Sequence, residues 1–139
     1  MPLDPDFIYD PPQSALEILY EDTDLIAINK PAELLSVMGR LPEHQDSAYL
    51  RILQKIPQAK VLHRLDMATS GILIFAKHRE AEVAMSRQFQ QRTIEKTYIA
   101  LVQGKLDGVG MIDVPLITDW DHRPRQKIDY EIGKSAQTQ

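Results

Sequence analysis

The residues with the clearest chemical potential lie in the stretch VLHRLDMATSGILIFAK, residues 61–77. It contains His63, Arg64 and Asp66 in a segment that is otherwise apolar enough to be buried. A carboxylate can act as a nucleophile or as a general base, and an arginine can bind an anionic or planar group. The segment therefore brings a nucleophile-type side chain and an anion-binding side chain close together.

The spacing predicts which of these side chains share a side of the backbone. Side chains alternate along a strand, so a strand over 61–66 would place Arg64 and Asp66 on one face and His63 on the other. Arg64 and Asp66 are thus predicted to converge at a strand terminus. Gly71, shortly afterwards, can adopt backbone angles that other residues avoid.

Three interpretations of this motif compete. In the first, which is the usual role of an arbitrary Arg-x-Asp, Arg64 and Asp66 form a structural ion pair that finishes a strand. In the second, Asp66 is a catalytic nucleophile or base, and Arg64 binds an anionic or planar substrate. The third is a metal site through His63 and Asp66. It has the least support, because these side chains are predicted on opposite faces and no second cluster supplies ligands.

The elements around the motif predict an α+β domain built on a mixed, mainly antiparallel sheet with flanking helices. One helix is expected after a cap at Asp46 or Ser47, and a second over residues 79–91. Strands are expected at residues 16–20, 25–29, 60–65, 71–77, 94–104 and 111–117, and another begins at 135–139.

The length and composition are those of one globular domain. The 139 residues are predicted to divide into an N-terminal tail, residues 1–15, and a domain over residues 16–139. Hydrophobic residues make up 43% and charged residues 26%, and no apolar run approaches the ~18 residues that span a membrane. The absence of cysteine excludes disulfides and thiolate metal sites, and it fits a reducing cytoplasm.

The charges are unevenly distributed along the chain. The net charge is −4, yet residues 51–98 carry 9 basic and 4 acidic side chains, whereas residues 1–50 carry 2 and 10. This asymmetry permits a basic surface for nucleic acid on an acidic protein. Solvated helices with scattered Arg and Lys would give the same count, so both interpretations stay open.

The longer motif, His-Arg-Leu-Asp followed after two residues by Thr-Ser-Gly, resembles the catalytic signature of the RluA-type pseudouridine synthases. ILYEDTDLIAINKP, residues 18–31, and EKTYIALVQG, residues 95–104, resemble two further motifs of that family. SVMGRL, DW..RP.QK and GK.AQT are similar to one branch, the dual-specificity enzymes that act on large-subunit (23S) ribosomal RNA and on transfer RNA. The resemblance covers residues 16–139.

This resemblance implies an activity and a partner. The fold would be the N-terminal half of the pseudouridine synthase catalytic fold, and the activity would be isomerisation of specific uridines to pseudouridine. No cofactor and no metal are implied. The partner would be structured RNA, namely 23S ribosomal RNA and transfer RNA stem-loops, in the cytoplasm and without a membrane.

The resemblance also gives roles to three residues. Asp66 matches the family's catalytic aspartate, a nucleophile whose attack on the base or on the sugar is left open. Arg64 matches the arginine that enters the RNA helix when the target nucleotide is flipped out. Tyr98 matches the tyrosine that packs on the flipped base, and it is expected on a strand next to Asp66. From spacing alone, Tyr98 would be taken for a core tyrosine.

Two departures from the family pattern shape the expectations. Many relatives have a glycine at the place of Glu33, and the later motif Gly-Arg-x-His-Gln-Leu-Arg, whose arginine pairs with the aspartate, is absent. We therefore expect the N-terminal part of a synthase that is inactive by itself and forms a non-native dimer through an uncovered sheet face. The rival hypothesis is a non-catalytic RNA-binding module that uses a basic surface over residues 51–98.

Overall fold

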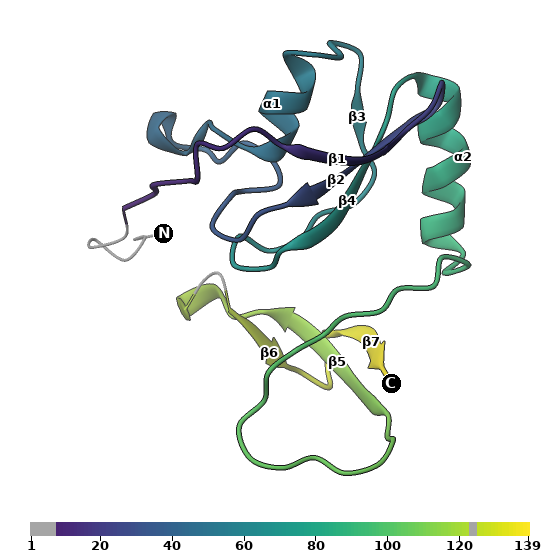
Figure 1. The fold of residues 1–139 in the computed structure, drawn as a ribbon. Coiled ribbons are helices and arrows are strands. Elements are labelled where there is room, and N and C mark those ends of the chain that lie inside the picture. Colours follow the sequence, from purple (N-terminus) through teal and green to yellow (C-terminus); the bar gives the residue numbers. More distant parts are fainter. Residues whose placement is uncertain (1–7, 123–124) are drawn as a thin grey trace. The chain divides into compact units, whose positions relative to one another are not determined.

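The computed structural model describes residues 8–122 and 125–139 (Figure 1). These residues form two compact units, an N-terminal unit of residues 8–97 and a C-terminal unit of residues 98–139. Within the described residues of both units, each pair of hydrogen-bonded strands is antiparallel, and the helices are few. The predicted α+β class with a mainly antiparallel sheet is confirmed, but the strands belong to two separate sheets.

The N-terminal unit is a four-stranded sheet with two α-helices (Figure 1). The strand order is β1-β2-β4-β3. Asp22 accepts the N–H groups of Asp24 and Leu25 at 2.8 and 2.7 Å, which closes the turn between the first two strands. The elements are β1 (Glu17–Glu21), β2 (Leu25–Lys30), η1 (Pro42–His44), α1 (Ala48–Leu53), β3 (Lys60–Val61), β4 (Gly71–Ala76) and α2 (Arg79–Gln90).

The core of this unit lies between the sheet and α1. Ile26 of β2 lies opposite Phe75 of β4, and Ile28 lies opposite Leu73, and all four side chains are at most 1% exposed. Ile52 of α1 joins the same cluster. Full burial of such a side chain stabilises the fold by about 1.5–3 kcal/mol, so this cluster fixes the sheet beneath the motif.

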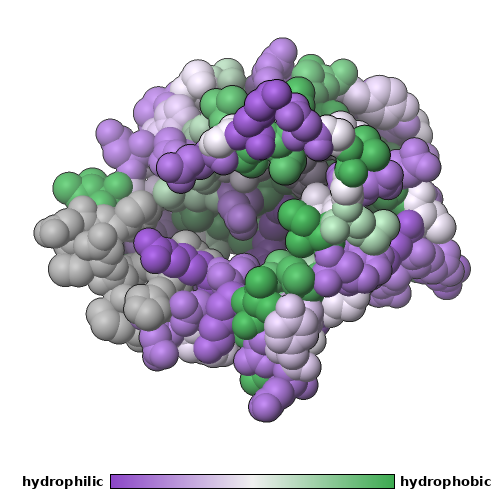
Figure 2. All heavy atoms as spheres, turned by 90° about the horizontal axis from the view of Figure 1, so that it is seen from below, coloured by the Kyte–Doolittle hydropathy of each residue, from purple (hydrophilic) through white to green (hydrophobic). Residues whose placement is uncertain are grey.

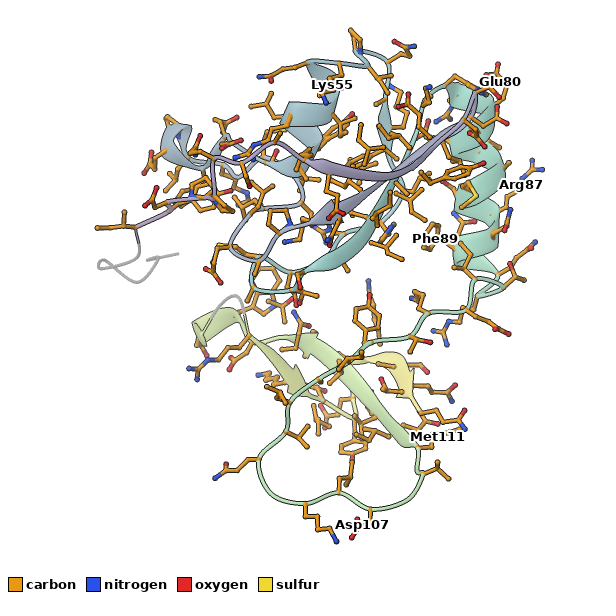
Figure 3. The ribbon with its side chains drawn as sticks, in the orientation of Figure 1. Lys55, Glu80, Arg87, Phe89, Asp107 and Met111 are labelled. Atoms are coloured by element: carbon orange, nitrogen blue, oxygen red, sulfur yellow. The ribbon has the colours of Figure 1, made fainter. Side chains whose placement is uncertain are left out.

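The two helices begin as the sequence indicates. The Ser47 hydroxyl accepts the N–H of Leu50 at 3.1 Å and caps α1, as predicted. The second helix starts after His78 and confirms the helix expected over 79–91 to within a residue. Figure 3 shows Phe89 of α2 turned toward the sheet and Arg87 turned away from it. Sequence patterns thus identified both helices.

Residues 8–14 belong to the predicted tail, and in the structure they are anchored to the N-terminal unit. The Tyr9 hydroxyl donates to the carbonyl oxygen of Asp46 at 2.8 Å and accepts the N–H of Leu35 at 3.0 Å. The Arg51 guanidinium donates to the carbonyl oxygen of Pro12 at 2.8 Å. The rest of that tail, residues 1–7, lies outside the described residues.

The C-terminal unit is a three-stranded sheet in which β5 lies between β6 and β7. The strands expected at 111–117 and 135–139 are confirmed by β5 and β7. The elements are β5 (Ile112–Thr118), η2 (Trp120–His122), β6 (Gln126–Ile128) and β7 (Lys134–Thr138).

The strand predicted over residues 94–104 is wrong. A strand exists only where a neighbour accepts and donates its backbone hydrogen bonds, and none of the described strands pairs with this stretch. Its apolar residues lie in water instead, with Ile99 and Leu101 essentially fully exposed. Figure 2 shows apolar side chains, in green, among hydrophilic ones on the face that it presents. Among the described helices, none has the length and apolar character needed to cross a bilayer.

Candidate active site

The strand that leads into the motif ends earlier than predicted, at Val61 rather than at residue 65. The N–H of Ile74 on β4 donates to the Nε2 atom of His63 at 3.1 Å, and the imidazole packs on the ring of Phe89. The imidazole of His63 thus accepts a hydrogen bond from β4 that the backbone of a longer β3 would otherwise accept. The main chain leaves the sheet after Val61. Burial, and secondarily the charge of Lys96, lowers the pKa of His63, which favours the neutral acceptor.

Burial still alternates through the segment, as predicted. Leu65 is 8% exposed, whereas Arg64 and Asp66 on either side of it are exposed. Within residues 8–122 and 125–139, neither Arg64 nor Asp66 takes part in an ion pair. The structure therefore does not support the structural interpretation in which the two side chains pair with each other.

Asp66 starts a tight turn. Its carbonyl oxygen accepts the N–H of Thr69 at 3.0 Å, and the chain then enters β4 at Gly71. Gly71 has a φ of 123°, which a residue with a Cβ rarely adopts, so the expectation of unusual backbone angles there is confirmed. The turn leaves the Asp66 carboxylate exposed at the point where the chain reverses.

The residue before Asp66 is held by a buried hydroxyl. Ser36, 5% exposed, donates through Oγ to the carbonyl oxygen of Leu65 at 2.6 Å and accepts the N–H of Leu65 at 3.0 Å. Both backbone groups of Leu65 are therefore satisfied by a single side chain from a loop that lies 29 positions earlier in the chain. This contact replaces the sheet pairing that was predicted for this residue.

The residue after Asp66 is held by a buried ammonium. The side chain of Lys30 is fully buried, and its Nζ atom donates to the carbonyl oxygens of Pro31, Leu34 and Met67 at 2.8, 2.7 and 3.1 Å. A buried charge is tolerated only when its donors are satisfied, and three carbonyl acceptors meet that need. The Lys30 ammonium thus links the backbone that follows β2 to the backbone immediately after Asp66.

Burial and the nearby negative charges have opposite effects on the pKa of Lys30. Burial lowers the pKa of its ammonium, and the nearby carboxylates of Glu33 and Asp66 oppose this effect. The negative charges of Glu33 and Asp66 therefore help to keep the buried ammonium of Lys30 charged.

Glu33 contributes through its backbone. Its φ is 65°, in the left-handed region, and its N–H donates to the carbonyl oxygen of Met67 at 2.8 Å. A left-handed residue at this place explains in physical terms why a glycine would suit it. The loop nevertheless reaches Met67 with a glutamate in this position.

Tyr98 lies in the C-terminal unit, outside any strand, with 61% of its surface exposed. The expectation that it belongs to a strand is wrong, for the same reason as the strand predicted over 94–104. The two units are not placed relative to each other, so the closeness of Tyr98 to Asp66 stays a prediction.

The metal interpretation gains no further ligands. In the described parts of the chain, no three His, Asp or Glu side chains gather as a metal site would require. Moreover, the Nε2 atom of His63 already accepts the N–H of Ile74. His63 is thus a structural side chain at the edge of β4.

Sequence reasoning missed the roles of Lys30 and Ser36. A signal was present for Lys30, since it follows Ile26 and Ile28 at two-residue spacing and therefore belongs on the buried face of β2. No comparable pattern marked Ser36, because a loop serine is ordinarily exposed.

Comparisons with known proteins agree on one family. The family described as RNA pseudouridylate synthase matches residues 24–139. The dual-specificity RNA pseudouridine synthase RluA of Vibrio vulnificus is 52% identical over 123 residues, which are 88% of this chain and 49% of that protein. The protein of the same name from Escherichia coli K12 is 50% identical over 133 residues, 94% of this chain and 61% of that protein. The chain thus spans about half to three fifths of the length of these relatives.

Solved structures share the fold. Human RNA Pseudouridylate Synthase Domain Containing 1 matches with a TM-score of 0.64 and 22% identity, over 98% of this chain and 51% of that one. Human RNA Pseudouridylate Synthase Domain Containing 4 matches with a TM-score of 0.52 and 20% identity, over 88% and 47%. At such identities the likeness concerns the fold alone.

Proposed function

The chain belongs to the RNA pseudouridylate synthase family, and from this premise we propose that it is part of an enzyme that converts specific uridines of 23S ribosomal RNA and transfer RNA to pseudouridine. The identity of about 50% to dual-specificity enzymes supports this choice of substrates. The reaction is an isomerisation and consumes no cofactor. The proposal implies the cytoplasm, where these RNAs are modified.

In this proposal Asp66 is the nucleophile. The glycosidic bond between C1′ and N1 of the uridine breaks, the base turns while it is held in the site, and a bond forms between C1′ and C5. A proton leaves C5 and N1 gains one, so atoms and electrons balance without an oxidant or reductant. The Asp66 carboxylate forms a transient covalent bond with the nucleotide and is released at the end.

Arg64 and Tyr98 serve the flipped nucleotide. A planar guanidinium can occupy the stacking space that the target base vacates and still contact phosphate, and Arg64 is exposed beside Asp66 for that role. Tyr98 would pack its ring on the flipped base, which needs an exposed aromatic face. Tyr98 offers one, since 61% of its surface is exposed.

The observation that carries the proposal is the state of Asp66. Its carboxylate is exposed and outside any described ion pair, while the backbone on both sides of it is fixed by buried donors. A nucleophile must be both reachable and held in place, and Asp66 meets both conditions.

The test is Asp66→Asn in the full-length protein, on stem-loop RNA that carries tritium at C5 of uridine. Tritium is released only if the C5 proton leaves, so the variant should release none while it still binds RNA. Asp107→Asn is the matched control, because that exposed carboxylate, labelled in Figure 3, pairs only with its neighbour Lys105 at 3.0 Å within the described residues. Release by the Asp66 variant at the control's rate would refute the role of Asp66.

The rival, a binding module without chemistry, needs a continuous basic surface. Figure 3 shows Lys55 beside α1 and Arg87 on the side of α2 that faces away from the sheet. These two exposed cations of the 51–98 stretch thus belong to different parts of the N-terminal unit. Binding of RNA by the full-length protein without any tritium release would favour the rival.

A further inference from the structure

We propose that Lys30 and Ser36 are positioning residues for Asp66, which act by fixing the backbone immediately before and after it. The inference rests on the proposed function of Asp66 as nucleophile, and it adds two residues that do not touch the substrate. Lys30 is the last residue of β2 and Ser36 lies in the loop that follows, and we call residues 30–36 together the 30–36 loop.

The first contact fixes the residue before Asp66. The Oγ atom of Ser36 is bonded to both the carbonyl oxygen and the amide nitrogen of Leu65, at 2.6 and 3.0 Å. Two bonds from one buried atom set the position and the rotation of that residue's backbone. Because Leu65 is itself 8% exposed, water is a poor substitute for the lost bonds if the hydroxyl is removed.

The second contact fixes the residue after Asp66. The carbonyl oxygen of Met67 accepts the Lys30 ammonium at 3.1 Å and the Glu33 N–H at 2.8 Å. Lys30 lies on the buried face of β2, directly opposite Gly71 of β4. An aliphatic side chain would fill this position at lower cost in hydration, so the choice of a charged donor points to the three carbonyls that it serves.

The two contacts bracket Asp66 from the same loop. With Leu65 and Met67 fixed, the Asp66 side chain retains only its own torsions, and its carboxylate starts from a defined Cα position. Displacement of a reacting group by about 1 Å can slow a reaction by about 100-fold. A loosened 30–36 loop should therefore slow turnover far more than it weakens RNA binding.

The structural half of the test measures amide hydrogen exchange in the chain by NMR. Lys30→Met, or Ser36→Ala if the first variant fails to fold, should speed exchange of the Thr69 amide about 10-fold or more, because its acceptor is the Asp66 carbonyl. The core amides of β2 should keep their protection. A merely structural role would speed exchange uniformly, and that result would overturn the inference.

The functional half measures single-turnover tritium release by the full-length protein. Lys30→Met and Ser36→Ala should each lower the maximal rate by about 10- to 100-fold and leave the RNA concentration for half-maximal rate within about 3-fold. Lys77→Met is the matched control. That ammonium also donates to fixed oxygens, those of the Glu21 carboxylate at 2.8 Å and the Asp22 carbonyl at 2.7 Å, but it follows the end of β4, whereas Asp66 precedes its start.

The outcomes separate this inference from the proposed function. Normal turnover in both positioning variants overturns the inference while Asp66→Asn still tests the nucleophile. Turnover by Asp66→Asn overturns the proposed function, whatever the positioning variants do. If Lys77→Met lowers the rate as much as the two positioning variants do, the effect comes from general destabilisation, and the positioning role is overturned.

Discussion

Ser36 lies against Leu65 with its Oγ atom 2.6 Å from the carbonyl oxygen and 3.0 Å from the amide nitrogen. One hydroxyl thus satisfies both backbone groups of the residue that precedes the proposed nucleophile. Such a contact does for Leu65 what a neighbouring strand would do, and it holds the motif after the chain has left the sheet.

Ser36→Ala should lower the free energy of unfolding by about 1–3 kcal/mol, because a buried N–H and a buried carbonyl lose their partner. Urea denaturation measures the change. Ser70→Ala, an exposed serine of the same motif, should stay within about 0.5 kcal/mol of the parent. Equal stabilities of the two variants would mean that water replaces the Ser36 hydroxyl at no cost.

Glu33→Gly should be more stable than Glu33→Ala by about 0.5–1 kcal/mol. Both changes remove the carboxylate near Lys30, but only glycine adopts the φ of 65° without steric cost, and its larger entropy in the unfolded chain offsets part of the gain. Comparison of the two variants by urea denaturation isolates the backbone effect. A more stable alanine variant would contradict a left-handed Glu33.

The stability of the folded protein should depend on pH through His78. Its side chain lies 2.8 Å from an oxygen of Asp24 and 2.9 Å from one of Glu80, and hydrogen bonds to these carboxylates raise its pKa. A raised pKa in the folded state contributes stability below the unfolded pKa of about 6.5, and that contribution is lost as pH rises through the folded value.

His78→Asn is the variant that tests it, because asparagine can cap α2 without a titratable charge. The difference in Tm between the parent and the variant should be larger at pH 5 than at pH 9, with the parent favoured at the lower pH. Thermal unfolding followed by circular dichroism measures it. His63, whose pKa is lowered, is common to both proteins and cancels from the comparison. An equal difference in Tm at pH 5 and pH 9 would mean that the charge of His78 does not contribute to stability.

The sequence predicted the elements that depend on local periodicity, and it failed where pairing partners decide. The cap at Ser47 and the helix after His78 follow from the residues themselves. In contrast, the stretch 94–104 contains the apolar and β-branched residues that are typical of a strand, yet no described strand pairs with it. A strand is a property of two segments, so a pattern within one segment cannot establish it.

The candidate site, too, was predictable from the sequence only in part. Alternation placed Arg64 and Asp66 on one side, and burial agrees with it. The contacts that fix the backbone around Asp66 could not be foreseen, because Ser36 and Lys30 bind Leu65 and Met67 from 29 and 37 positions away. Side-chain bonds to backbone over such separations leave no periodic trace in the sequence.

Arg64 should contribute to RNA affinity through phosphate. In the full-length protein, Arg64→Gln should weaken binding to a stem-loop RNA and reduce the slope of log K against log salt by about 1, because one counterion-releasing contact is lost. Arg79→Gln is the matched control, since that exposed guanidinium is already paired with Glu82 at 2.6 Å. An unchanged slope with Arg64→Gln would exclude a phosphate contact by Arg64.

The exposed apolar residues of the 94–104 stretch should govern self-association of the chain rather than its stability. Ile99 and Leu101 bury almost none of their surface in the described structure, so Ile99→Ser with Leu101→Ser should change the free energy of unfolding by less than about 0.5 kcal/mol. Leu73→Ala, in the core, should cost about 2–5 kcal/mol. Apolar surface left in water favours contact with a second copy, so sedimentation equilibrium should show weaker association for the double variant than for the parent. Unaltered association with a large loss of stability would mean that Ile99 and Leu101 are buried within the monomer in solution.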